Sequence, residues 1–180
     1  MTAPTLRLVD PSEAVRFQEL LHAAYRQATE LGVRYIAATV GLDQVREHLA
    51  QNVAYGYDVD SRLAVTASIR YPWGPNPGPF ALPHLGWLAV DPDLTRQGWS
   101  KRIMAAVEAD LRDHSHVPAV SLGIADEHPW LARYYRSLGY RDAGAADIGL
   151  GHLTRYLIKP LDDAGFARVL DRYPTLKEYS

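Results

Sequence analysis

The residues best placed to do chemistry lie in a short turn between an apolar segment and an amphipathic one. The apolar segment ends at Val90, and a turn containing Gly98 leads directly into a segment of helical periodicity. Backbone N–H groups at a helix start lack acceptors and carry partial positive charge, so they attract anions. Gly98 has no Cβ to keep an anion away, and Arg96 and Lys101 add positive charge. The pattern indicates either an anion-binding turn or a solvated basic turn.

A second informative segment is aromatic and reads HPWLARYYRSLGY over residues 128–140. Its spacing predicts a short helix over residues 129–138, which Gly139 ends. Tyr134 and Tyr135 are neighbours on this helix and lie about 100° apart around its axis, so they face different surroundings.

Several other chemistries are disfavoured. The chain has no cysteine, which removes disulfides, thiolate metal ligands and a cysteine nucleophile. The seven histidines form no metal-ligand pair at helical spacing, so we expect no metal. Ser121 and Ser137 lack the glycine-flanked setting of a serine nucleophile.

Composition narrows the class of protein further. The 180 residues are 47% apolar and 22% charged with a net charge of -2, which is typical of a globular protein and gives no nucleic-acid footprint. We find neither a signal sequence nor an apolar stretch of about 20 residues, so we expect no membrane association and a cytoplasmic location.

Periodicity predicts the elements that position these residues. Strands are expected over residues 5–9, 53–58, 63–71, 84–90, 119–124, 140–143 and 152–159, and helices over 12–31, 42–49, 98–113, 129–138 and 162–171. The proline-rich segment 71–83 is expected to be a loop.

This order predicts an α/β (α+β) fold. We expect a mixed, mostly antiparallel central sheet of six to seven strands with helices on both faces. We place one domain over residues 1–160 and a C-terminal extension over 161–180.

The two chemical segments together resemble the GCN5-related N-acetyltransferase (GNAT) superfamily. That family has an Arg/Gln-x-x-Gly-x-Gly/Ala turn after a strand ending in Val-x-Pro, and later an aromatic–Tyr–x–x–x–Gly–aromatic stretch. Here the turn is residues 95–100 (TRQGWS) after Val90-Asp91-Pro92, and the later stretch is residues 134–140. Thr95 and Ser100 depart from the family pattern, which bears on cofactor affinity. The element order also matches an acyl-CoA N-acyltransferase fold.

The resemblance implies an acetyl-CoA site. Backbone groups of the strand and the turn would hold the pantetheine arm and the pyrophosphate, Tyr135 would protonate the departing thiolate, and His128 replaces an asparagine that often contacts the cofactor. The implied cofactor residues are Leu88, Ala89, Val90, Arg96, Gln97, Gly98, Trp99, Ser100, Lys101 and His128.

The attacking amine must lose a proton, so a base is needed. Many relatives use a glutamate on the central strand, but residues 84–88 contain no carboxylate. His84 is the nearest titratable group, with an ordinary pKa of about 6.5. A structural histidine at the strand edge is the alternative role, and Asp126 and Glu127 are alternative bases.

The acceptor is expected at loops that this fold places over its cleft, where Arg34, Tyr35, Tyr71 and Trp73 are candidate contacts. We therefore expect an acetyl-CoA-dependent enzyme that acetylates the amine of a small molecule by direct attack. A catalytically silent CoA-binding sensor and a protein N-acetyltransferase are the alternatives. A homodimer also stays open, since the last 20 residues could dock on a second copy.

Overall fold

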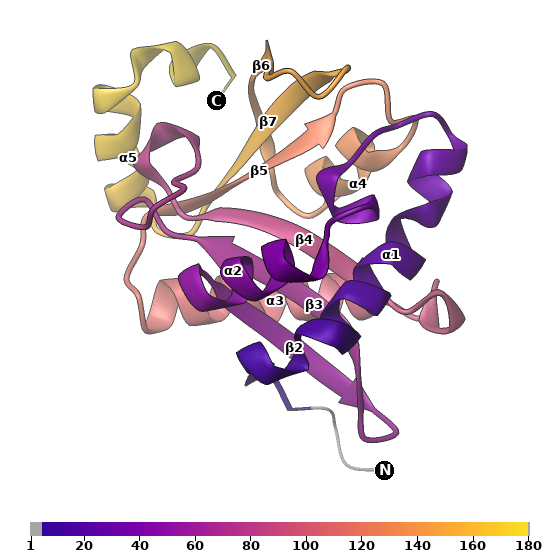
Figure 1. The fold of residues 1–180 in the computed structure, drawn as a ribbon. Coiled ribbons are helices and arrows are strands. Elements are labelled where there is room, and N and C mark those ends of the chain that lie inside the picture. Colours follow the sequence, from indigo (N-terminus) through magenta and orange to yellow (C-terminus); the bar gives the residue numbers. More distant parts are fainter. Residues whose placement is uncertain (1–4, 180) are drawn as a thin grey trace. The chain divides into compact units, whose positions relative to one another are not determined.

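Figure 1 shows the computed structural model, which describes residues 5–179. The chain forms two compact units. The first contains Met1–Ile69 and Gly86–Val107, and the second contains Arg70–Leu85 and Glu108–Ser180. Residues 1–4 and 180, which the domain boundaries drawn from the sequence include, lie outside the described part.

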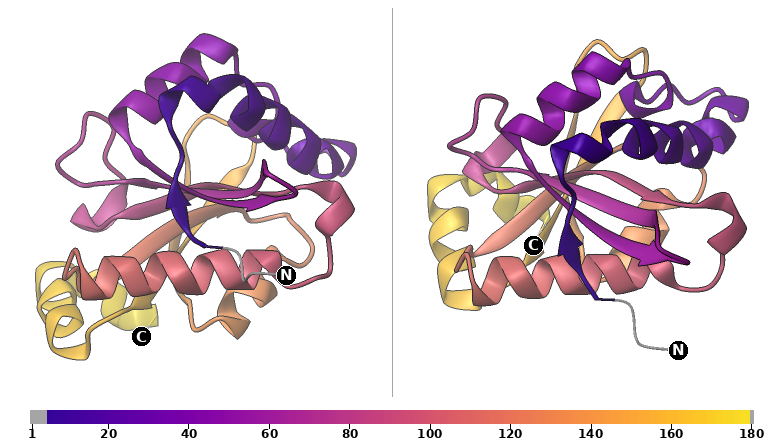
Figure 2. Two further views of the ribbon diagram at one scale, coloured as in Figure 1. Left: turned by 90° about the horizontal axis from the view of Figure 1, so that it is seen from below. Right: turned by 60° about the horizontal axis from the view of Figure 1, so that its bottom comes forward.

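The first unit holds two helices on one face of an antiparallel pair of strands and a third helix on the other face (Figure 2). Strand β2 pairs antiparallel with both β1 and β3, and Tyr55 lies opposite Ala67. Its elements are β1 (Arg7–Leu8), α1 (Ala14–Glu30), α2 (Leu42–Gln51), β2 (Val53–Val59), β3 (Arg62–Arg70) up to Ile69, β4 (His84–Val90) from Gly86, and α3 (Trp99–Asp113) up to Val107.

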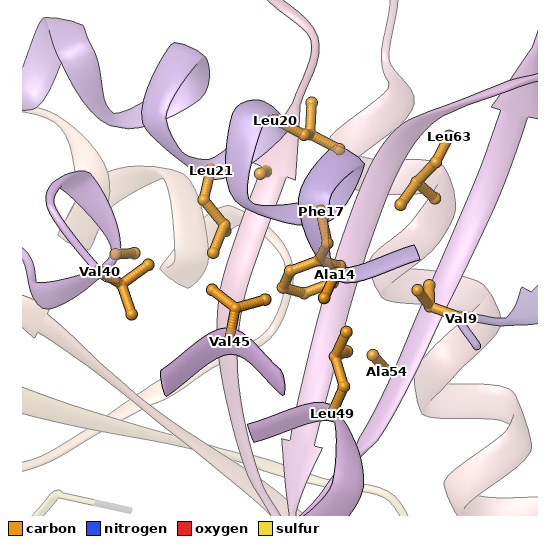
Figure 3. Close-up of a cluster of buried hydrophobic side chains, with 12 residues drawn as sticks. Val9, Ala14, Phe17, Leu20, Leu21, Val40, Val45, Leu49, Ala54 and Leu63 are labelled. Carbon is orange, nitrogen blue, oxygen red and sulfur yellow. The ribbon is translucent and has the colours of Figure 1, made fainter. Parts of the chain in front are cut away.

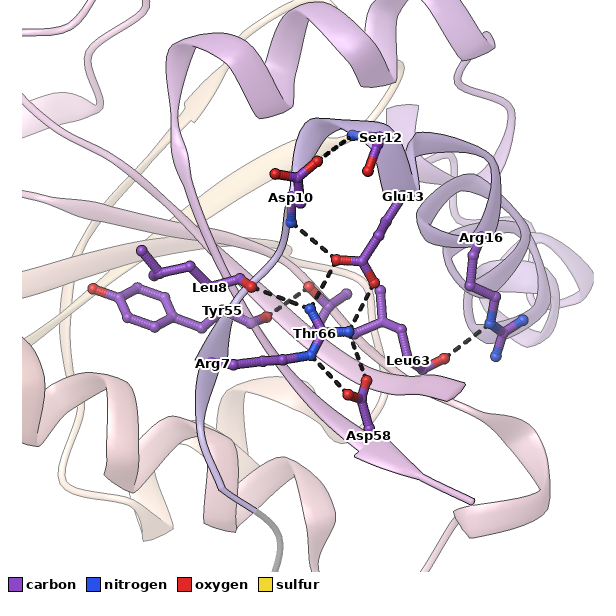
Figure 4. Close-up of polar contacts among 10 residues, drawn as sticks. All are labelled: Arg7, Leu8, Asp10, Ser12, Glu13, Arg16, Tyr55, Asp58, Leu63 and Thr66. Carbon is purple, nitrogen blue, oxygen red and sulfur yellow. Dashed lines mark hydrogen bonds and ion pairs between the residues drawn. The ribbon is translucent and has the colours of Figure 1, made fainter. Parts of the chain in front are cut away.

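A capped 3-10 helix over Pro11–Glu13 leads directly into helix α1 (Figure 4). The Asp10 carboxylate accepts from the Ser12 N–H at 2.8 Å, and the Glu13 carboxylate accepts from the Asp10 N–H at 3.0 Å. This reciprocal capping matches the helix start that Asp10-Pro11-Ser12 predicts. Arg7 joins the same region by pairing with Glu13 at 2.7 Å and Asp58 at 2.6 Å.

The core of the first unit lies between α1, α2 and the sheet (Figure 3). Phe17, Leu20 and Leu21 of α1 are fully buried, as is Val45 of α2. Burying each large apolar side chain contributes about 1.5–3 kcal/mol, so helical periodicity is sufficient to fix this face of α1.

The second unit is built on three antiparallel strands. Strand β7 pairs with β5 from Ala119↔Pro160 to Ala125↔Thr154, and with β6 on its other side. Its elements are β5 (Ala119–Ala125), α4 (Leu131–Ser137), β6 (Arg141–Asp147), β7 (Leu153–Pro160) and α5 (Asp163–Arg172), with a 3-10 helix over Pro174–Tyr179.

The C-terminal extension is part of this second core. Phe166 of α5 and Leu176 of the 3-10 helix are buried with Ala119 and Ile158. The prediction of a helix over 162–171 is confirmed within one residue at each end. These apolar side chains are covered by the chain's own strands.

The seven strands form one mixed sheet in the order β1-β2-β3-β4-β5-β7-β6. Strands β4 and β5 are parallel, through His84↔Ser121 and Leu85↔Leu122, and the other pairings given above are antiparallel. The predicted fold class and element order are therefore confirmed. None of the helices within residues 5–179 is long and apolar enough to cross a membrane.

Candidate active site

The turn that follows β4 in the first unit is anchored by Asp91. Its carboxylate pairs with Arg16 at 2.9 Å and with Arg62 at 3.3 Å. Arg16 also donates to the carbonyl of Leu63 at 2.9 Å, which ties the same guanidinium to β3 (Figure 4). A 3-10 helix over Pro92–Leu94 follows Asp91. The contacts of Asp91 therefore fix the point from which the chain enters the predicted anion site at residues 96–101.

Residues 95–101, which we call the cofactor turn, present their backbone at the surface. Arg96 and Gly98 both adopt left-handed conformations, with φ of 61° and 81°. Helix α3 begins at Trp99, and the Arg102 N–H donates to the Gly98 carbonyl at 3.1 Å. The side chains of Arg96, Gln97 and Lys101 are exposed. A helix start with flanking cations is the arrangement that binds phosphate groups.

Strand β4 is irregular just before its last three residues. Trp87 has φ of 47°, in the left-handed region that a bulky residue rarely adopts within a strand. The Trp87 ring stacks on the His48 imidazole, with centroids 3.7 Å apart and planes 20° from parallel. Such a backbone departs from regular pairing, so it changes the direction in which the following peptide groups point.

A chain of hydrogen bonds ends at the peptide bond before Trp87. The Ser68 hydroxyl donates to the Gly86 carbonyl at 3.2 Å, and His48 Nε2 lies 2.9 Å from the same hydroxyl oxygen. Since the single Ser68 proton goes to Gly86, His48 Nε2 must be the donor in the second bond. His48 Nδ1 then accepts from the Asn52 amide at 3.4 Å. The sequence did not single out His48 or Ser68.

In the second unit, Tyr135 is buried on α4 within a group of aromatic rings. It packs edge-on against Tyr134 and Tyr140, with centroids 5.1 and 5.7 Å apart. Tyr134 is half-buried, and besides Tyr135 it packs against the exposed Trp130. The two tyrosines contact each other, but Tyr135 is buried beside Tyr140 and Tyr134 lies beside an exposed ring.

The ring beside Tyr135 is held by a buried charged pair. Tyr140 donates to the Glu108 carboxylate at 2.8 Å, and Lys159 forms an ion pair with the same carboxylate. Burial and the nearby Glu108 raise the pKa of Tyr140 well above its ordinary value, so its phenol stays protonated. The arrangement fixes the surroundings of Tyr135 on one side.

Three other predicted residues lie near the start of α4. His128 is buried, and its Nδ1 has no hydrogen-bond partner among residues 5–179. Burial lowers its pKa, so the neutral form is favoured. Asp126 pairs with Arg155, whereas Glu127 is exposed. Because Asp126 is paired with Arg155, its carboxylate is a weaker candidate for the general base than the sequence alone suggested.

His84, the residue expected to act as a base, is buried at the start of β4. Its Nδ1 lies 2.9 Å from the Ser121 hydroxyl, which donates to the Pro83 carbonyl at 3.2 Å. His84 Nδ1 is therefore the donor, and Nε2 is left as an acceptor. Burial, with a smaller contribution from the charge of Arg70, lowers the pKa of His84 to about 3. The prediction of His84 as a base relied on an ordinary pKa of about 6.5, and the buried imidazole does not keep that pKa.

The predicted acceptor residues are divided between the units. In the second unit, Tyr71 stacks on the exposed Trp73, with centroids 4.6 Å apart, and its hydroxyl lies 3.3 Å from that of Ser115. In the first unit, Arg34 is exposed and Tyr35 packs edge-on against Tyr25 at 5.4 Å. Segment 71–83 is a loop, as predicted, with a 3-10 helix over Pro79–Ala81.

This loop approaches His84 closely. A Cβ added at Gly78 would lie 2.2 Å from the His84 Cβ, so only glycine fits there. Arg70, the last residue of β3, is half-buried near Tyr156 and His84, and its positive charge helps to lower the pKa of His84. We call Arg70, His84 and Tyr156 the Arg70 cluster. The sequence did not reveal it, because its members come from three strands.

The chain matches a family model described as an acetyltransferase (GNAT) domain, over residues 22–151. The chain belongs to the GNAT family. The resemblance drawn from the turn and the aromatic segment is thereby confirmed, and the protein is an acyl-CoA-dependent N-acetyltransferase.

Two relatives from Bacillus subtilis (strain 168) are similar to this GNAT protein. One, an S-(2-succino)cysteine N-acetyltransferase, is 41% identical over 159 residues, which are 88% of this chain and 96% of the relative. The other, an S-alkylcysteine N-acetyltransferase, is 30% identical over 142 residues, or 78% of this chain and 80% of the relative.

Solved structures share the fold at low identity. The PaiA N-acetyltransferase from Thermoplasma acidophilum, determined in complex with coenzyme A, superposes with a TM-score of 0.69. The match covers 88% of this chain and 99% of that one, at 12% identity. It supports the GNAT architecture.

Proposed function

We propose that this enzyme acetylates the α-amine of an S-substituted cysteine. The observation that carries this proposal is the 41% identity to an S-(2-succino)cysteine N-acetyltransferase over nearly the full length of both chains. The second relative, which acts on S-alkylcysteine, supports the same class of acceptor. Both named acceptors are amino acids with a substituent on sulfur. We therefore assign the small-molecule amine expected from the sequence to this class of amino acids.

In the proposed reaction, the neutral amine nitrogen attacks the thioester carbon of acetyl-CoA in a ternary complex. A C–N bond forms, the C–S bond breaks, and the thiolate of CoA leaves. The amine loses one proton and the thiolate gains one, so the products are an N-acetyl amino acid and CoA. The enzyme must position two substrates, stabilise charge on the thioester oxygen and move these protons.

We assign the cofactor to backbone groups of the first unit. The amides of the cofactor turn would bind the pyrophosphate, with Arg96 and Lys101 adding charge. Peptide groups of Leu88, Ala89 and Val90 would pair with the pantetheine arm, and one amide there would face the thioester oxygen. The left-handed Trp87, with its His48 stack and the Ser68 hydrogen bond, supports this assignment because it re-aims these peptide groups.

Proton transfer is assigned to the second unit. Tyr135 would protonate the leaving thiolate, and its packing in a fixed group of rings favours a defined position for the phenol. His84, with Nε2 as an acceptor, could bind an N–H of the attacking amine. A pKa of about 3 makes it a poor proton acceptor near neutral pH. We therefore propose that His84 orients the amine and that water removes the proton.

The test is turnover with defined acceptors. Purified protein is mixed with acetyl-CoA and S-(2-succino)cysteine, S-methylcysteine or lysine, thiol release is followed, and mass spectrometry locates the acetyl group. We expect release only with the cysteine derivatives, and an acetylated α-amine. Binding of acetyl-CoA without release above its hydrolysis for any amine would support the silent-sensor alternative and contradict the proposal.

A further inference from the structure

Arg70 differs from the other half-buried arginines in having no ionic partner. Four arginines are half-buried among residues 5–179: Arg7, Arg16, Arg70 and Arg155. Arg7, Arg16 and Arg155 each pair with an aspartate or glutamate. Within the same part of the chain, the guanidinium of Arg70 makes no hydrogen bond or ion pair.

The guanidinium of Arg70 is partly withdrawn from water, but its nitrogens are not fully buried. Burial lowers the pKa of Arg70, and the neighbouring group that acts on it is the Tyr156 phenol rather than a carboxylate. A guanidinium that a solute can still reach forms paired, charge-assisted hydrogen bonds to a carboxylate. The chain supplies such a carboxylate to its other half-buried arginines, so the missing one at Arg70 indicates a ligand.

The neighbours of Arg70 suit an amino acid. Tyr156 packs edge-on against both His84 and Phe80, with centroids 6.3 and 6.0 Å apart. His84 is neutral with Nε2 as an acceptor, so the cluster combines one cation with one neutral acceptor. The complementary ligand carries a carboxylate and an N–H donor, and no acidic side chain of the cluster would repel it.

We propose that Arg70 binds a carboxylate of the acceptor, and that it selects acidic amines over neutral ones. This inference rests on the proposed function, because it places the acceptor at the Arg70 cluster. The carboxylate can come from two sources in S-(2-succino)cysteine. One is the α-carboxylate, which every cysteine derivative carries, and the other is the succinyl substituent.

The experiment compares three acceptors that differ in carboxylates. S-(2-succino)cysteine has both kinds, S-methylcysteine has only the α-carboxylate, and S-methylcysteamine has none. Arg70→Met keeps the length and apolar stem of the side chain but removes the charge. We expect it to lower kcat/KM for S-(2-succino)cysteine at least tenfold, while the KM for acetyl-CoA and the rate with S-methylcysteamine stay unchanged.

The three acceptors separate the possible sources. A matching loss with S-methylcysteine assigns the α-carboxylate, whereas a loss confined to S-(2-succino)cysteine assigns the succinyl group. Equal losses with all three amines, or no loss with any, would overturn the role of Arg70. Failure of the wild-type enzyme to acetylate either cysteine derivative would instead overturn the proposed function.

Two controls distinguish binding from folding. Arg168→Met removes an exposed cation of α5 in the same unit and should leave all three rates unchanged. Thermal unfolding of Arg70→Met should occur at the wild-type temperature or above it, because the substitution removes an unpaired, half-buried charge. A lower unfolding temperature together with equal losses for all amines would show a structural role and contradict the proposal.

Discussion

The cofactor turn and the Arg70 cluster are two proposed binding sites that are built in different ways. The turn is a contiguous, mostly exposed segment, and its proposed binding groups are backbone amides that Asp91 and Gly98 place at the start of α3. The cluster is partly buried, and its members are side chains from the end of β3, the start of β4 and the middle of β7. The first depends on local conformation, whereas the second depends on tertiary packing.

This difference predicts how each region responds to substitution. A backbone site tolerates changes of side chain but fails when its conformation or approach path is altered. A side-chain site fails when a single functional group is removed, even if the backbone is unchanged. Four further substitutions test this contrast, in order of decreasing expected effect.

Tyr135→Phe should give the largest effect, because it removes one functional group of the second unit and leaves its ring packing intact. We expect kcat to fall by roughly 10- to 1000-fold, the lower part of this range reflecting the good thiolate leaving group. Acetyl-CoA affinity should change little. Steady-state kinetics with a true acceptor measure both, and Tyr134→Phe is the matched control with near wild-type kcat. A wild-type kcat for Tyr135→Phe would remove this residue from the mechanism.

Gly98→Glu tests the backbone site of the first unit. The new side chain adds a Cβ at φ of 81° and a negative charge beside the proposed pyrophosphate position. Acetyl-CoA affinity should fall at least tenfold, or about 1.4 kcal/mol. Gly32→Glu is a suitable control, since Gly32 has φ of 80° and also has open space around it. Calorimetric titration giving equal affinities for the two folded variants would argue against the cofactor turn.

The burial of His84 should appear in the pH dependence of stability. Its folded pKa of about 3 lies below the unfolded value of about 6.5, so the folded state favours the neutral form. The resulting stabilisation is complete above pH 6.5 and is lost as the pH falls toward 3, by up to about 1.4 kcal/mol per pH unit. Urea unfolding should show a shallower loss in His84→Gln over this range. Parallel curves for both proteins would contradict the burial of a neutral imidazole.

Ser68→Ala tests whether side chains support the backbone of β4. It removes the hydroxyl that links His48 to the Gly86 carbonyl, so we expect a severalfold fall in kcat/KM for acetyl-CoA as well as lower stability. Thr66→Val is the matched control, because Thr66 is also buried on β3 and donates to the Tyr55 carbonyl. If both variants lose stability and neither loses activity, the Ser68 hydrogen bond serves folding alone.

The elements that could be predicted from the sequence are those set by local pattern. The periodicity of Phe17 and Leu21 defined α1, and Gly98 directly before an amphipathic segment defined the cofactor turn. These signals lie within a few residues of the feature they predict. The order of helices and strands along the chain also followed from these local patterns, whereas the order of the strands within the sheet did not.

The remaining features depend on contacts between distant residues. Nothing near Trp87 in the sequence signals a left-handed residue, because its conformation depends on α2 and β3. Arg70 lies inside the strand that is expected over residues 63–71, between Ile69 and Tyr71, and the sequence does not distinguish it from any other charged strand residue. Its missing partner becomes visible only when the other half-buried arginines are seen paired. The depressed pKa of His84 likewise depends on burial, which the sequence does not give.

Crossed calorimetric titrations test the division between the two regions most directly. Acetyl-CoA is titrated into Gly98→Glu and Arg70→Met, and S-(2-succino)cysteine is then titrated into each variant saturated with CoA. We expect Gly98→Glu to lower the affinity for acetyl-CoA at least tenfold and to leave the affinity for S-(2-succino)cysteine unchanged, and Arg70→Met to lower only the affinity for S-(2-succino)cysteine. A lower affinity of Arg70→Met for acetyl-CoA, with a wild-type affinity for S-(2-succino)cysteine, would contradict the division between the two regions.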